Sequence, residues 1–176
     1  MLTIPTSLTV INETDVRGKA LLALIMANVS VAGFYGFRSI GVQNPMSLVS
    51  FPCVMVDPAW QTAVMERLGK YTIKIGYNLY FYLQDSDPDS IVTQATDIGE
   101  ALIKLFSNDA LGDLGSPGQT NKFKTYPNPA GGYFWLNSDM GKLTWSTSYL
   151  NATPDNQQTY MRAGLLPFEI QDVVLK

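Results

Sequence analysis

The sequence predicts an α+β fold, in which two helices pack on a mostly antiparallel, mixed sheet with a long hairpin or loop added. Residues 70–84, KYTIKIGYNLYFYLQ, alternate between two faces along one long strand, which is typical of an antiparallel sheet with one buried face. Residues 88–106 follow at once with helical spacing, and residues 12–28 predict another helix. The length of 176 residues and the hydrophobic share of 46% suit a single domain over residues 1–176.

The first predicted helix follows a short, Thr-rich lead, residues 1–11, which we interpret as an N-terminal arm. Asn12 can cap this helix, and Glu13 and Asp15 lie in its first turn, where acidic side chains favour the helix dipole. The helix is expected to end near Asn28 and to present a broad apolar face, made of Val16, Ala20, Leu21, Leu24, Ile25 and Ala27.

Two strands are predicted next. Residues 51–56 indicate a short buried strand closed by Asp57 and Pro58, and residues 59–69 indicate a helical turn or a loop. The long strand that follows separates its side chains into two sets. The expected buried set is Tyr71, Ile73, Ile75, Tyr77, Leu79, Phe81 and Leu83, and the opposite set is Thr72, Lys74, Gly76, Asn78, Tyr80, Tyr82 and Gln84.

The second predicted helix begins at an acidic turn. Asp87 can cap it, Pro88 suits its first position, and Asp89 complements its dipole. Asp85, Asp87 and Asp89 are also spaced like the start of a calcium loop, but Ser90 and Thr96 replace the glycine and glutamate that such a loop needs. We therefore assign the aspartates to capping. The expected apolar stripe is Ile91, Ala95, Ile98, Leu102, Leu105 and Phe106, and the outer side carries Thr93, Asp97, Glu100 and Lys104.

The last third of the chain is predicted to be rich in loops. Residues 112–132 contain many Gly, Pro and Asn residues and predict an extended loop or hairpin. Pro167 interrupts the final strand, which we therefore place at an edge of the sheet. The remaining expected elements are strands over 133–136 and 142–148, a turn over 137–141, a polar loop over 151–158 and the final strand over 165–175.

Composition argues against several classes of enzyme. The chain has no histidine, so the commonest general acid/base and metal ligand is missing. The single cysteine, Cys53, excludes an internal disulfide and suits a buried thiol in the apolar run FPCVMV. We expect no enzymatic activity and no cofactor. A carboxylate hydrolase remains the alternative, with Asp57 and Glu66 as a pair that could meet in space.

Charge is sparse and uneven. Charged residues are 15% of the chain against roughly 25% in typical soluble proteins, which favours a surface buried against partners. Residues 85–113 hold seven acids and one lysine, a net charge of −6. No basic cluster suited to phosphates occurs. The aromatic and basic residues that could form an interface are Tyr80, Tyr82, Lys122, Phe123, Lys124 and Tyr126, although core packing is an equal explanation for the two tyrosines of the strand.

One segment of the chain carries a membrane signal. Residues 20–37 are free of charge over eighteen positions, which is near the lower limit for a spanning helix. Asn28 and Ser30 interrupt the run, and Gly33 and Gly36 follow them. We expect no membrane segment, and a membrane-associated protein is a further alternative.

The order of these elements resembles that of the tail terminator proteins of tailed bacteriophages and of related tail-completion and neck proteins. Pro52 and Val54 match the short P-x-V strand of that family, and Gly69 and Tyr71 match the glycine and aromatic at the start of its long strand. The resemblance covers about residues 12–148. The loop over 112–132 and the chain beyond residue 151 are longer than the family pattern.

The resemblance implies a structural protein of the virion, made in the host cytoplasm, that forms a ring and caps the tail tube. Such rings are usually hexamers. The implied partners are other copies of the chain, the tail tube protein, a neck or connector protein, and the sheath as a further candidate. Asp97 and Glu100 would then face a channel through which DNA passes without specific binding, because like charges repel. A head–tail connector or stopper is the nearest alternative.

Overall fold

The computed structural model describes residues 13–29, 33–38, 51–67, 70–110, 137–152 and 158–175. Two helices and one seven-stranded sheet make up this part of the chain, which confirms the predicted α+β class. The predicted loop over 112–132 lies outside the described residues. The elements are α1 Glu13–Asn28, β1 Tyr35–Arg38, β2 Cys53–Arg67, β3 Lys70–Asp85, α2 Pro88–Ala110, β4 Asn137–Met140, β5 Thr144–Trp145, β6 Tyr149–Ala152 and β7 Gln158–Leu175.

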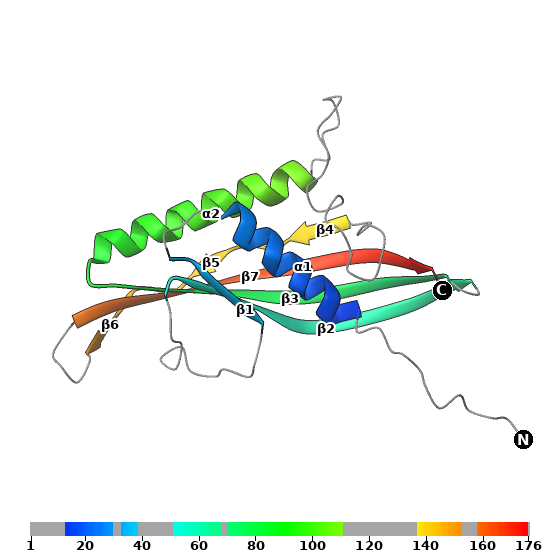
Figure 1. Cartoon of the computed structure of the whole chain (residues 1–176), viewed down its shortest axis with the longest axis horizontal. Helices are drawn as coiled ribbons and strands as arrows, with labels where there is room; N and C mark the ends of the chain where they lie inside the picture. The colour runs from blue at the N-terminus through cyan, green and yellow to red at the C-terminus, as the bar shows by residue number, and fades with distance from the viewer. Residues whose placement is uncertain are drawn as a thin grey trace, which may run out of the picture.

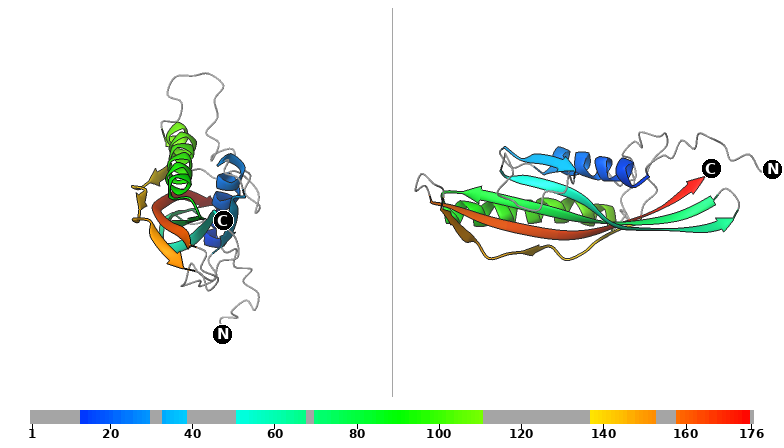
Figure 2. Two further views of the ribbon diagram at one scale, coloured as in Figure 1. Left: turned by 90° about the vertical axis from the view of Figure 1, so that its left-hand side faces the viewer. Right: turned by 90° about the horizontal axis from the view of Figure 1, so that it is seen from below.

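The sheet is mixed, as predicted. Its strand order is β1-β2-β3-β7-β4, and β5 and β6 also pair with β7 (Figure 1). Among the described strands, only the β1–β2 pair is parallel, and all the others are antiparallel. Helix α1 contacts β1 and β2, and α2 contacts β3, β7 and β4, so the helices divide one face of the sheet between them (Figure 2).

Strand β3 supplies the centre of the core. Its odd-numbered side chains from Ile75 to Leu83 are buried against the helices, which confirms the alternation read from the sequence. The predicted stripe of α2 is buried in full: Ile91, Ala95, Ile98, Leu102, Leu105 and Phe106. On α1, Ala20, Leu21, Leu24 and Ile25 are buried as expected, whereas Ala27 is exposed because it lies at the edge of the packed stripe.

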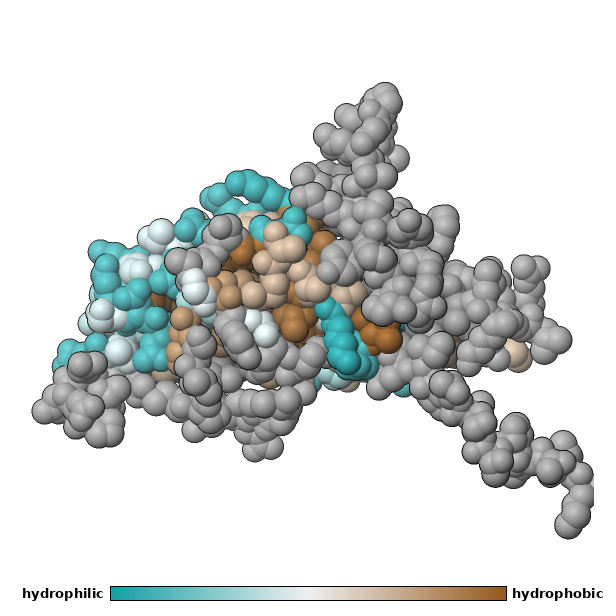
Figure 3. Space-filling model, viewed as in Figure 1, coloured by the Kyte–Doolittle hydropathy of each residue, from teal (hydrophilic) through white to brown (hydrophobic). Residues whose placement is uncertain are grey.

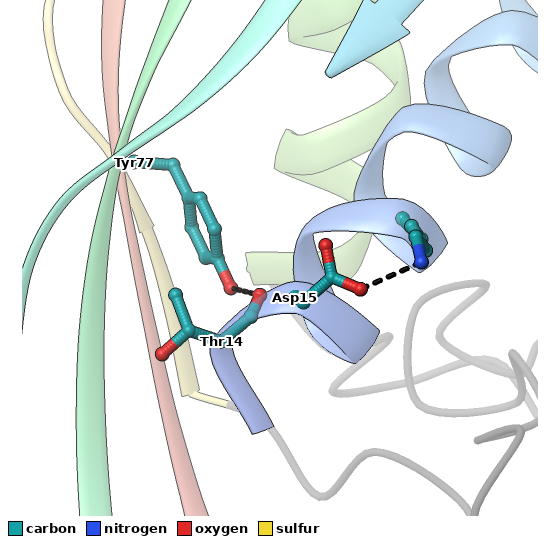
Figure 4. A network of polar contacts seen from close by, with 4 residues as sticks. Thr14, Asp15 and Tyr77 are labelled. Carbon is teal, nitrogen blue, oxygen red and sulfur yellow. Dashed lines mark hydrogen bonds and ion pairs between the residues drawn. The ribbon is translucent and has the colours of Figure 1, made fainter. Parts of the chain in front are cut away.

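A tyrosine of β3 ties α1 to the sheet. The Tyr77 hydroxyl donates a 2.7 Å hydrogen bond to the Thr14 carbonyl oxygen in the first turn of α1 (Figure 4). The Thr14 hydroxyl donates to the Gln61 side-chain oxygen in β2. One turn further on, Asp15 and Lys19 form an ion pair of 2.6 Å. The start of α1 is thereby fixed over the middle of the β2–β3 pair.

Strand β2 is far longer than predicted. The structure contradicts two predictions here, because β2 continues to Arg67. There is no closing turn at Asp57 and Pro58, and the described part of residues 59–69 is a strand rather than a helical turn or loop. The long β3 strand offers a pairing partner throughout, and register shifts at Pro58/Trp60 and Met65/Arg67 accommodate the irregular positions. Beyond the first turn of α1, β2, β3 and β7 project as an arm, which comprises Thr62–Arg67, Lys70–Lys74 and Gln171–Leu175 (Figures 1 and 2).

Strand β7 occupies an interior position, so its predicted place at an edge is wrong. It pairs with β3 along one side and with β6, β5 and β4 in turn along the other. Pro167 fits there because its position falls between the stretches paired with β5 and β4. The Gly141 N–H donates a 2.8 Å hydrogen bond to the Pro167 carbonyl oxygen. Pro167 itself has no N–H group, but no described strand pairs with it on this side, between β5 and β4, so no ladder hydrogen bond is lost there.

Several short predictions also change. Residues 137–140 form β4 rather than a turn, and β1 has no counterpart in the prediction. The strand expected over 142–148 is reduced to Thr144–Trp145, and the polar loop over 151–158 begins and ends within strands. Residues 133–136 and 153–157 lie outside the described residues.

Two tryptophans lie over glycines of neighbouring strands. A Cβ added to Gly76 would meet the Trp60 ring at 2.2 Å, and one added to Gly164 would meet the Trp145 ring at 2.6 Å. The Phe81 ring packs against Trp145, with 6.1 Å between the two ring centroids. The Arg162 guanidinium lies 5.7 Å from the centroid of the Trp145 ring. The Trp145 ring therefore has little room to yield, whereas Trp60 is 45% exposed and can move.

We predict opposite effects for two Gly→Ala variants. Gly164→Ala should lower the free energy of unfolding by about 1–3 kcal/mol, because the new methyl group collides with the confined Trp145 ring. Gly99→Ala, inside α2, should raise it by up to about 1 kcal/mol, since its Cβ meets only Leu143 at 3.5 Å and alanine favours helix. Urea unfolding of both variants measures the difference, and equal stability would contradict the packing at Trp145.

Candidate assembly surface

The face of the sheet opposite α1 and α2 carries a row of tyrosines. The Tyr80 and Tyr82 rings stack, with centroids 6.5 Å apart and planes 10° apart. The Asn78 amide donates a 3.4 Å hydrogen bond to the Tyr80 hydroxyl. We call Asn78, Tyr80 and Tyr82 the tyrosine face. All three side chains are partly buried, and neither helix of the described chain covers them, so packing beneath a described helix does not account for the row.

Apolar side chains border the tyrosine face. Cys53 and Met55 of β2 pair with Tyr82 and Tyr80, and both are buried. Burial raises the pKa of the Cys53 thiol to about 12, although a hydrogen bond with the Tyr82 backbone partly offsets this. The prediction of a buried thiol is confirmed. Leu165 of β7 pairs with Tyr80 on the other side and is partly buried.

A groove of about 430 Å³ continues the tyrosine face toward the arm. Trp60 and Pro167 line it together with Gly76, and Asn78 and Glu169 add polar groups. The Lys74 ammonium lies 3.7 Å from the Glu169 carboxylate. The sequence prediction missed this groove because it assigned Trp60 to a turn or loop. The signal that could have predicted the extended strand, and with it the groove, is the uncharged run over residues 60–65, which begins with Trp60.

The acidic turn before α2 is a capping structure. The Asp87 carboxylate accepts a 3.0 Å bond from the Asp89 N–H, as predicted. Asp85 accepts bonds from the Ser90 hydroxyl at 2.6 Å, the Asp87 N–H at 3.1 Å and the Gln94 amide at 3.1 Å. These oxygens are already used by protein donors. Within the described ranges no group of three or more metal-ligating side chains occurs.

The outer side of α2 is acidic and exposed, as expected. Asp97 and Glu100 lie there, and Glu100 is 3.6 Å from Lys104. A hydrophilic surface runs along the top of the molecule in the view of Figure 3, where α2 lies. This acidic face and the tyrosine face are on opposite sides of the sheet. Lys122, Phe123, Lys124 and Tyr126, the other predicted interface residues, lie outside the described residues.

The alternative readings receive little support from the geometry. Asp57 and Glu66, considered as a hydrolase pair, belong to the same extended strand, nine positions apart. At about 3.3 Å per residue their backbones are separated by roughly 30 Å, so they cannot form one catalytic pair within a chain. In the part of the chain that the structure describes, no helix is both long and apolar enough to span a membrane.

No protein-family model and no curated protein matches the sequence.

We predict that Asp85 stabilises the fold above the acidic range. The hydrogen bond from Ser90, followed by that from the Asp87 backbone, lowers the pKa of Asp85 from 3.8. A carboxyl group with a lowered pKa in the folded state stabilises the fold at pH values above its pKa in the unfolded chain. This stabilisation is lost as the pH falls through the pKa of the group in the folded state. Asp85→Asn should therefore be less stable than wild type near pH 7, and the difference should shrink at about pH 3.

Urea unfolding at the two pH values provides the measurement. Asp97→Asn, a substitution on the exposed side of α2, is the matched control and should show a much smaller difference at either pH. A stability deficit of Asp85→Asn that does not change with pH would contradict the proposed charge-dependent cap.

Proposed function

We propose that the protein is a structural component of a bacteriophage tail, a tail terminator that assembles into a ring and joins the tail tube to the neck. The tyrosine face is the observation that carries the proposal. It combines stacked aromatic rings and an amide, all partly exposed, on a side of the sheet that no described helix covers. Aromatic residues are enriched and charged residues depleted at the centres of protein interfaces.

Two further features support an assembly role. Only 15% of the residues are charged, which suits a chain that buries much of its surface against partners. The acidic side of α2 and the tyrosine face lie on opposite sides of the sheet. One can thus contact a neighbouring copy, the tail tube or a neck protein while the other faces a channel. A ring built from such contacts is heterologous and closes by rotation.

The first test concerns the ring itself. Wild-type protein should form closed particles in electron microscopy and a single large species in native mass spectrometry. Tyr80→Lys should reduce the ring population by roughly tenfold or more, because a charge would have to be desolvated at the interface. Thr93→Lys, on the exposed side of α2, introduces the same charge away from the tyrosine face and should leave the ring population unchanged.

Unfolding curves keep this test interpretable. Tyr80 is only partly buried, so Tyr80→Lys should retain a cooperative transition close to that of wild type. A wild-type chain that stays monomeric at high concentration, or a Tyr80→Lys variant that forms rings as well as wild type, would count against the proposal.

The second test concerns the channel. The double variant Asp97→Lys, Glu100→Lys changes the charge of each subunit by four units on the exposed side of α2. If this side faces the channel, the variant ring should retain duplex DNA at low salt and release it as salt rises, whereas the wild-type ring should not bind it. Electron microscopy would show whether the DNA threads the ring. DNA bound only to the outside would place the acidic side of α2 on the exterior.

A further inference from the structure

Among the described strands, the outer side of β2 is unpaired over most of its length. Strand β1 pairs with this side only from Cys53 to Val56. From Asp57 to Arg67, β2 pairs with β3 on its inner side, and no strand of the described chain pairs with the outer side. Between the register shifts at its two ends, the stretch Trp60–Met65 runs without interruption.

This edge lacks the usual protection against pairing. Residues 58–65 carry no charge, and the charged residues of the free stretch, Asp57, Glu66 and Arg67, stand at its two ends. Trp60, Val64 and Met65 are 45%, 62% and 61% exposed. Proteins normally shield long apolar edges with charges, prolines or bulges, because such edges add strands from other chains. An unshielded stretch of six residues is therefore suited to accept a strand.

A segment of the chain has the right properties to occupy the edge. Thr6–Ile11, TSLTVI, is also six residues long, is uncharged, and consists mainly of residues that favour strands. The segment begins after Pro5 and contains no proline, so each of its residues has a backbone N–H group to donate. The described chain begins just after it, at the start of α1, where Thr14 is hydrogen-bonded to Gln61 of β2. The described chain therefore begins close to the outer edge of β2.

We propose that Thr6–Ile11 of a second copy of this chain adds as a strand to the outer edge of β2 over Trp60–Met65. This inference rests on the proposed ring, which requires a contact that links each copy to the next. Strand addition supplies one, since the donating and accepting surfaces differ and the contact is heterologous. The backbone ladder gives affinity, and the exposed side chains of Trp60 and Val64 give the contact its register.

A cross-linking experiment separates the two possible sources of the strand. The full chain carrying both Thr9→Cys and Thr62→Cys is treated with a short bismaleimide, and the native Cys53 stays in place because it is buried. A ladder of covalent oligomers is expected, and mixing the two single variants should give a linked dimer. Products linked only within one chain would overturn the inference, because they would show that the segment folds back on its own edge.

A second pair of variants tests the edge itself. Val64→Lys should weaken ring formation by roughly tenfold, because it places a charge on the accepting strand. Val92→Lys on α2 is the matched control, since Val92 is 50% exposed and lies away from the edge. Deleting residues 1–11 should abolish the ring while the unfolding transition persists. Rings that survive the deletion would overturn the strand addition alone, whereas a monomeric wild-type chain would contradict the proposed ring function.

Discussion

The two ladders of β3 constrain the whole molecule. All sixteen residues of β3 have register partners in β7, and most have partners in β2 as well. Because side chains alternate along a strand, a slip of one residue would turn Ile75, Tyr77 and the buried positions after them away from the helices. The register of β3 thus decides which face receives the core and which face carries the tyrosines.

The helices follow from that register. Helix α2 begins three residues after β3 ends, and its buried stripe packs over β3 and β7. Helix α1 covers β1 and β2 and is joined to β3 through the Tyr77 hydroxyl and the Thr14 carbonyl (Figure 4). The bond is made by a buried side chain, so it orients the helix where there is little competing water. Both helices lie on one side of the sheet, and no described helix covers the opposite side, which carries the tyrosines.

The elements with local signals could be predicted from the sequence, and those that depend on distant partners could not. Strand β3, helix α2 and its capping aspartates have their periodicity and end signals within their own residues. The second half of β2 has a proline and a weak pattern of its own, and it is extended because β3 lies beside it. Pro167 predicts a strand at the edge of the sheet, because proline cannot donate a ladder hydrogen bond. A gap between β5 and β4 opposite this residue meets the same requirement inside the sheet. The alternation of β3 placed Tyr80 and Tyr82 on one face in advance, whereas the groove beside them depends on Trp60 meeting Gly76 across two strands.

The opposite border of the sheet is built from β6, β5 and β4, which pair with successive parts of β7 as three short pieces. A border broken in this way offers no long continuous template, whereas the border at β2 does. Growth by strand pairing is therefore one-sided within the described chain. Edge-to-edge pairing of two whole described sheets would therefore stop at two copies joined at β2, whereas a strand supplied by a separate segment is not limited in this way.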